Sequence, residues 1–174
     1  IAITSWHRRV RHAQSPAVPT ALVGLVMLQG ALGMWTVTLL LKPVIVSLHL
    51  IGGMATLSLL VWLASRELGV GAGCADNAAA ARLRPWVGVA LAVLIVQIAL
   101  GAWVSSNYAA LACVDFPKCH GVWVPDMDFR HGFQFVRELG RTAAGEHLAY
   151  TALTAIHWTH RVGALVTFVY GGAV

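Results

Sequence analysis

The sequence predicts an all-α membrane protein, a bundle of transmembrane helices, from its composition and from the length of its apolar segments. Of its 174 residues, 58% are hydrophobic and 11% are charged, and the mean hydropathy is +0.72. A soluble domain carries about 25% charged residues. A helix needs about 20 apolar residues to cross the hydrocarbon core of a bilayer. Four blocks approach or exceed this length, at residues 17–41, 44–65, 86–106 and 153–174.

The order of these blocks suggests how the chain runs. The first two are separated only by Lys42 and Pro43, so we expect a tight helical hairpin. The third follows a short basic segment, and the fourth follows a long polar loop at residues 107–152. No apolar signal-peptide core precedes the basic start. The chain begins at Ile1 without a methionine and its last block stops at Val174, which favours a piece of a longer protein.

The distribution of charge predicts the topology. Segments rich in Lys and Arg stay on the cytoplasmic side of a membrane. Such arginines precede the first block and lie between the second and third blocks: Arg8, Arg9, Arg11, Arg66, Arg82 and Arg84. The loop at 107–152 mixes both signs, so we place it on the periplasmic or outer side of a bacterial inner membrane. This topology accounts for the net charge of +5, and no nucleic-acid partner is needed to explain it.

Two cysteines in the predicted outer loop are placed to form a bridge. Cys113 and Cys119 flank the segment VDFPK, in which Pro117 favours a turn that brings the two within disulfide distance. Disulfides persist on the oxidising side of a membrane. We predict a structural disulfide here and a reduced Cys74 in the inner loop. A redox-active pair and two free thiols are the alternatives.

Three histidines lie inside the apolar blocks, where an ionisable side chain is costly and faces the bundle interior. At 1.5 Å per residue, His49 lies about 8 Å and His160 about 10 Å below the outer helix ends. His157 is one turn from His160 on nearly the same face. Histidine is a standard axial ligand of haem iron, so the similar depths favour haem binding. Hydrogen bonding between helices is the alternative.

Residues near these histidines suit a flat cofactor. Arg161 is expected at the outer interface, where it would pair with a carboxylate such as a haem propionate, or with lipid headgroups. Gln29 and Gln97 lie mid-helix and are expected to bond between helices. They occupy equivalent positions in LQGALGMW (28–35) and VQIALGAW (96–103), at an offset of 68 residues. The match is too short to establish a repeat by itself. Small residues follow two of the histidines: Gly52, Gly53, Gly163 and Ala164.

Three segments resemble the haem A synthase family of cytochrome oxidase assembly proteins. They are LQGALGMWTVTLLLKPVIVSLHLIGG, QIALGAWVSSNYAALACVDFPKCHGVWVPDMDF and IHWTHRVGAL. The resemblance runs from about residue 15 to the end of the chain. It implies a haem-dependent oxidoreductase that oxidises a methyl group of haem O to the formyl group of haem A.

The resemblance also implies an organisation. Members of the family have eight transmembrane helices in two four-helix halves, and each half holds a haem between paired histidines. Residues 1–68 would be the last two helices of the N-terminal half, and 69–85 a cytoplasmic linker. Residues 86–174 would be the first two helices of the C-terminal half, with the outer loop between them.

By the same resemblance, His49 would bind the substrate haem, which is haem O before the reaction and haem A after it. His160 would bind a haem b that passes electrons. His157 and Arg161 would lie near a haem edge or propionate. The two partner histidines and the family's catalytic glutamate would lie on helices outside this chain.

Partners and alternatives complete the expectation. The implied partners are haem O, an electron donor, membrane lipid, haem O synthase and cytochrome oxidase assembly factors. One alternative is a membrane di-haem b electron-transfer subunit without substrate chemistry. Another is a non-haem assembly or transport protein in which the histidines only tie helices together.

Overall fold

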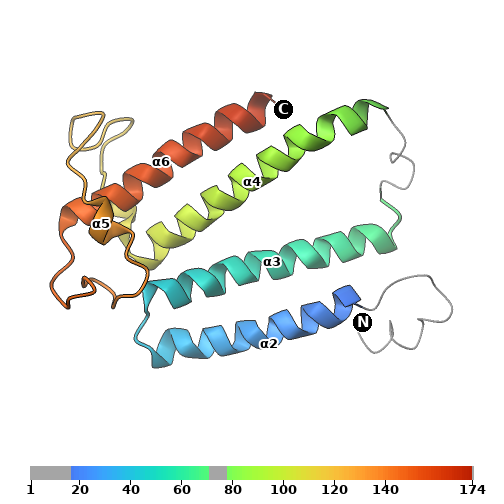
Figure 1. The fold of residues 1–174 in the computed structure, drawn as a ribbon, viewed down its shortest axis with the longest axis horizontal. Helices are drawn as coiled ribbons and strands as arrows, with labels where there is room; N and C mark the ends of the chain where they lie inside the picture. The colour runs from blue at the N-terminus through green and yellow to red at the C-terminus, as the bar shows by residue number, and fades with distance from the viewer. Residues whose placement is uncertain (1–16, 71–77, 174) are drawn as a thin grey trace.

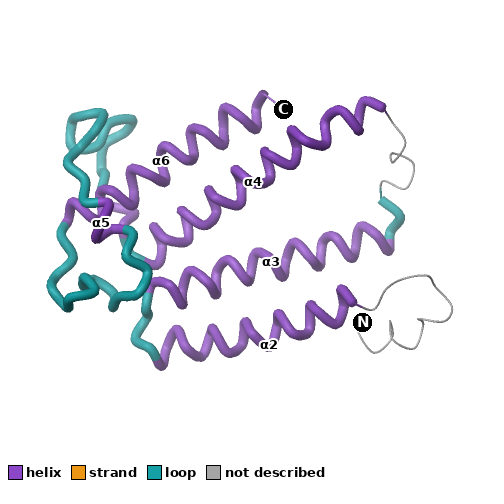
Figure 2. Tube along the Cα trace, in the orientation of Figure 1, coloured by secondary structure: helices purple, strands orange, loops and turns teal. Residues whose placement is uncertain are grey.

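The computed structural model describes residues 17–70 and 78–173, and within these ranges it is helical, without strands (Figures 1 and 2). The predicted all-α class is therefore confirmed. The long helices are α2 (Ala17–Thr38), α3 (Pro43–Glu67), α4 (Ala78–Ser106) and α6 (Tyr150–Ala173). Two short helices, η1 (Ala109–Leu111) and α5 (Phe129–Gly132), lie in the loop between α4 and α6. The predicted inner arginines Arg8, Arg9 and Arg11, the inner Cys74, and Val174 lie outside the described residues.

The long helices lie side by side in the order α2, α3, α4, α6 (Figure 1). Each contacts the next, and within the described residues α2 and α6 do not touch. Figure 2 shows the loop between α4 and α6 gathered at one end of this row. The arrangement is an open row, so apolar side chains remain exposed along it; Val37 is 74% exposed and Phe168 is 80% exposed. Lipid or further helices must cover such surfaces.

Three of the predicted spans are supported by length and hydropathy: α2, α3, and the part of α4 from Ala80 to Ser106. The chain is thus a polytopic membrane protein. The described α6 has 24 residues and packs along α4, but it is not among the helices that meet this criterion. The fourth span therefore stays a prediction.

Two helix ends differ from those that hydropathy predicts. Helix α2 ends at Thr38 and not at residue 41, because Leu40 and Leu41 adopt φ angles of 53° and 57°. That left-handed region cannot continue a right-handed helix. Helix α4 begins at Ala78, well before the predicted residue 86, and carries Pro85 inside it. Alanine, leucine and arginine favour helix regardless of hydropathy, so part of the predicted linker at 69–85 is helical.

The loop folds back over the ends of α3, α4 and α6 and forms the best-buried part of the chain. Trp103 is 5% exposed, and its indole N–H donates to the carbonyl of Gly132 at 3.0 Å. A Cβ at Gly132 would lie 2.8 Å from the carbonyl oxygen of Ala152, so only glycine lets α5 approach α6 this closely. The cluster comprises Trp103, Val104, Ala109 and Ile156, with Val44, Phe133 and Leu153 packed against it.

A buried arginine ties the loop to the end of α4. Arg137 is 4% exposed and donates to the side-chain oxygen of Asn107, which is also buried. Its other donors reach the backbone carbonyls of Gln134, Glu138 and Arg141. Burial lowers the pKa of Arg137, yet a guanidinium stays charged in proteins. The loop is therefore built around a cation that the sequence alone did not single out.

A hydroxyl pair joins α3 to α4 at the same end of the row. Ser47 and Ser106 are both buried, and their hydroxyl oxygens lie 2.8 Å apart. The Ser47 hydroxyl also reaches the carbonyl oxygen of Ala102 at 3.4 Å. These bonds anchor the two helix pairs to each other near the loop.

Candidate functional site

On the α4–α6 pair, His160 lies half-buried against α4. Its Nδ1 is 3.0 Å from the amide Nε2 of Gln97, which also donates to the carbonyl of His160 at 3.1 Å. A Cβ at Gly101 would lie 3.2 Å from Cε1 of His160, so the ring rests directly on the α4 backbone. A Cβ at Gly163 would lie 2.3 Å from Oε1 of Gln97. Both glycines make room for the pair of side chains.

The α2–α3 pair repeats this arrangement. A Cβ at Gly33 would lie 3.3 Å from Cε1 of His49, and one at Gly52 would lie 1.7 Å from Nε2 of Gln29. Gln29 and Gly33 of α2 recur as Gln97 and Gly101 of α4 at an offset of 68 residues. His49 and Gly52 of α3 recur as His160 and Gly163 of α6 at an offset of 111. The short sequence match is therefore part of a structural repeat. Sequence reasoning missed Gly33 and Gly101 as site residues, although the match contains both.

Hydrogen bonding differs between the two pairs. In the first, Nδ1 of His49 and Nε2 of Gln29 are both buried and have no partner among the described residues. In the second, Oε1 of Gln97 is the atom left without one. An unpaired buried polar group costs about 1–3 kcal/mol. These unpaired atoms all belong to the glutamines of the two pairs and to the histidine of the first pair.

The ring nitrogens suit a metal ligand. Within the described residues, Nε2 of His49 and Nε2 of His160 carry no hydrogen bond. A neutral imidazole binds haem iron through one such nitrogen. The residues present therefore fit the haem ligation that the sequence predicts, with one histidine on each helix pair.

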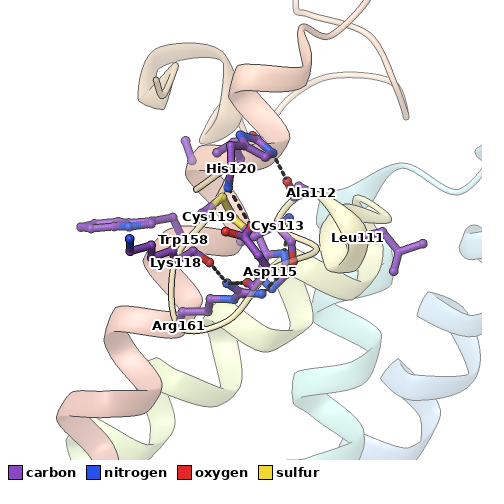
Figure 3. The surroundings of a disulfide bond; sticks show 12 residues. Leu111, Ala112, Cys113, Asp115, Lys118, Cys119, His120, Trp158 and Arg161 are labelled. Atoms are coloured by element: carbon purple, nitrogen blue, oxygen red, sulfur yellow. Dashed lines mark hydrogen bonds between the residues drawn. A yellow bond between two sulfur atoms is a disulfide. The ribbon is translucent and has the colours of Figure 1, made fainter. Parts of the chain in front are cut away.

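His157 and Arg161 are used differently. His157 is 9% exposed; its Nδ1 accepts from the backbone N–H of Cys113 at 3.2 Å, and its Nε2 faces Nε of Arg161 at 3.2 Å. The Arg161 guanidinium donates to the carbonyls of Cys113, Asp115 and Lys118 at 2.7, 2.7 and 3.0 Å (Figure 3). A neutral imidazole accepts at one nitrogen only. In either tautomer the lone pair of His157 therefore faces a protein donor.

The loop that Arg161 holds is closed by the predicted disulfide. Cys113 and Cys119 are bonded, with their Cα atoms 4.9 Å apart, and both are buried. The Asp115 carboxylate accepts from the backbone N–H groups of His120 and Gly121 at 2.7 and 2.8 Å (Figure 3). The bond from Gly121 contributes most to lowering the pKa of Asp115. The disulfide loop is thus locked both covalently and by hydrogen bonds.

Two histidines of the loop have defined partners. Nε2 of His120 lies 2.8 Å from the carbonyl oxygen of Ala112. The His120 ring stacks on the ring of Tyr150, with the two centroids 5.7 Å apart. Nδ1 of His131 lies 2.5 Å from a carboxylate oxygen of Asp128, and this bond lowers the pKa of Asp128. Both stabilise the loop, and their role could not be read from the sequence.

A family model described as cytochrome oxidase assembly protein matches residues 1–174. The chain belongs to the cytochrome oxidase assembly protein family. The resemblance noted in the sequence is thereby confirmed. The heme A synthase of Shewanella oneidensis is 38% identical over 170 residues, which cover 96% of this chain and 51% of that relative. The heme A synthase of Halalkalibacterium halodurans is 30% identical over 165 residues, covering 92% and 53%.

This member of the family spans about half the length of the curated relatives it matches. No solved structure matches it. The match to the relatives includes both helix pairs, so the repeated histidines lie within the shared region.

Proposed function

We propose that this chain supplies two haem ligands of a haem A synthase, an oxidoreductase that converts a methyl group of haem O to the formyl group of haem A. The observation that carries the proposal is the repeated site. Each of two helix pairs presents one half-buried histidine that rests on a glycine of the neighbouring helix, and whose Nε2 has no hydrogen bond to another described residue. The names of the similar curated proteins support the same activity.

The two histidines receive different roles in this proposal. Helices α2 and α3 belong to an N-terminal half, where His49 binds haem O and then haem A. Helices α4 and α6 belong to a C-terminal half, where His160 binds haem b. The bound haem b supplies electron transfer. The protein's part is to orient each imidazole against a glycine and to hold the two pairs together through Ser47 and Ser106.

His157 and Arg161 act in the proposal through the disulfide loop. Their contacts with Cys113 and with the loop carbonyls support a role in fixing this loop over the outer end of α6. We therefore assign the axial position on α6 to His160. The bonds to the loop and to His157 use four of the five N–H donors of Arg161, so one donor remains for a contact with a group such as a propionate.

The proposed orientation places the disulfide loop on the periplasmic side of a bacterial inner membrane. Its support is that the last turn of α3 and the first turns of α4 carry Arg66, Arg82 and Arg84. Figure 1 shows these helix ends at the end of the row opposite that loop. Haem O, an electron donor, haem O synthase and cytochrome oxidase assembly factors are the partners that this activity would require.

The activity is tested in the full-length protein, expressed together with a source of haem O and assayed by chromatography of the extracted haems. The His49→Ala variant should form no haem A while haem b remains bound. The control is His147→Ala, which alters an exposed histidine of the loop. Haem A at the wild-type level in His49→Ala would contradict the proposal. Haem b as the only pigment of the wild type would favour an electron-transfer subunit instead.

The ligand on α6 is tested by absorption spectroscopy of the same protein. His160→Ala should remove the haem b signal, since an axial ligand sets spin state and retention. His157→Ala should leave that signal in place. Loss of the signal in His157→Ala alone would reverse the assignment.

A further inference from the structure

We infer that Gln29 and Gln97 are positioning residues, each of which holds Nδ1 of the histidine on the facing helix and so aims its Nε2. The inference rests on the proposed function for what Nε2 binds. Its basis in the structure is the contact of each glutamine with the histidine, or with the glycine one turn from it, on the neighbouring helix.

The α4–α6 pair shows the contact directly. The Gln97 amide makes two bonds to His160, one to the ring and one to the backbone carbonyl. The Gln97 amide occupies the space that a side chain at residue 163 would fill, because a Cβ there would overlap Oε1, so only glycine admits it. The Gln97 side chain therefore lies between Gly163 and the imidazole of His160.

The α2–α3 pair holds the same two groups without joining them. The Gln29 amide fills the slot at Gly52, and His49 fills the one at Gly33. The atoms that correspond to the bonded pair, Nε2 of Gln29 and Nδ1 of His49, are the ones left buried and unpaired. Joining them would satisfy both atoms at once.

The chemistry explains why an amide suits this position. An imidazole that gives its Nε2 lone pair to iron carries its proton on Nδ1, and that N–H needs an acceptor. A glutamine amide has a donor and an acceptor on one carbon, so a half turn about Cγ–Cδ presents Oε1 in place of Nε2. The unpaired Oε1 of Gln97 is this acceptor. This half turn gives up the bond from Nε2 to the carbonyl of His160, and in exchange Oε1 accepts from the Nδ1–H of a metal-bound ring.

The test uses the full-length holoprotein and measures the reduction potential and electron paramagnetic resonance spectrum of haem b. In Gln97→Glu, a carboxylate acceptor strengthens the histidine as a ligand, so the potential should fall below that of the wild type. In Gln97→Met, which keeps the length but has no acceptor for Nδ1–H, the potential should rise. Haem should also be held about 10–100-fold more weakly in Gln97→Met. A packing role would shift both variants in one direction.

The matched control is Val96→Leu, which changes the exposed neighbour of Gln97 and should leave the potential unchanged. If Gln97→Glu does not take up haem, Gln97→Met decides alone. Wild-type potential and retention in that variant would overturn the inference.

The second site is tested by titrating haem O into Gln29→Met, with Leu28→Met as the control. We expect about 10–100-fold weaker binding in the Gln29 variant only. Equal affinities would overturn the inference for this site. If His49→Ala and His160→Ala also retain haem, the proposed function fails; if they lose it while the glutamine variants match the wild type, only this inference fails.

Discussion

Adjacent glycines on α3 offer a sharp test of the slot that receives Gln29. A methyl group added at Gly52 would lie 1.7 Å from Nε2 and 2.8 Å from Cδ of Gln29, whereas one added at Gly53 would meet nothing within 4 Å. The same substitution, Gly→Ala, should therefore have opposite consequences at two consecutive positions.

The expected magnitude follows from these distances. Overpacking a filled site costs about 1–3 kcal/mol. The Gln29 amide is the end of a flexible side chain and can swing away, so Gly52→Ala should fall near the lower limit. A loss of about 1 kcal/mol lowers the Tm by roughly 2–4 °C in a protein of about 150–250 residues, and by less in the longer full-length protein. Gly53→Ala should not be destabilising, because alanine has the higher helix propensity and meets no neighbour.

Thermal unfolding of the full-length protein in detergent measures the difference between the two variants. Because both gain the same helix propensity, the difference isolates the contact with Gln29. Adding Gln29→Ala to Gly52→Ala should restore most of the lost stability, as a coupled pair does in a double-mutant cycle. Equal Tm values for Gly52→Ala and Gly53→Ala would refute the close contact between Gly52 and the Gln29 amide.

Three further outcomes are expected in the loop. In intact cells, a membrane-impermeant thiol reagent should label Cys113 and Cys119 only after reduction, because the two are bonded and buried; labelling without reductant would argue against the bridge. The bond from His131 lowers the pKa of Asp128. The stabilisation that this bond gives is therefore complete above the pKa of the unfolded carboxyl, about 4, and is lost as the pH falls through the lower pKa of the folded state. The loop of the wild type should therefore become less resistant to protease at acid pH, and this pH dependence should be weaker in Asp128→Asn. Arg137→Met should cost at least about 1–3 kcal/mol in thermal unfolding, since it leaves buried acceptors unpaired; a wild-type Tm would mean that the buried guanidinium does not organise the loop.

The sequence predicted those features that depend on local chemistry. Hydropathy over a fixed length located the apolar helices, because crossing a bilayer requires long apolar segments whatever their neighbours. Cysteine spacing pointed to the bridge between Cys113 and Cys119, which the structure contains. Three histidines of the apolar segments, His49, His157 and His160, stood out because ionisable groups are rare in such segments.

Helix ends and the loop were beyond such reasoning. The left-handed residues Leu40 and Leu41 end α2 although their side chains are as apolar as the helix itself. Arg137 looks like any loop arginine in the sequence, and only packing of the loop over Trp103 and Asn107 buries it. Backbone turns and burial depend on contacts between distant segments, which a local pattern does not contain.

The sequence by itself determined that this protein is a helical membrane protein with histidines in its apolar segments, and it indicated the family. Tertiary structure decided how the ring nitrogens of those histidines are hydrogen-bonded. His157 and His160 share a helix face and chemistry, yet the loop N–H of Cys113 and the guanidinium of Arg161 occupy the ring nitrogens of His157 alone. It also turned a short sequence match into a repeated site, because two glycines matter only when a facing helix places an imidazole against them.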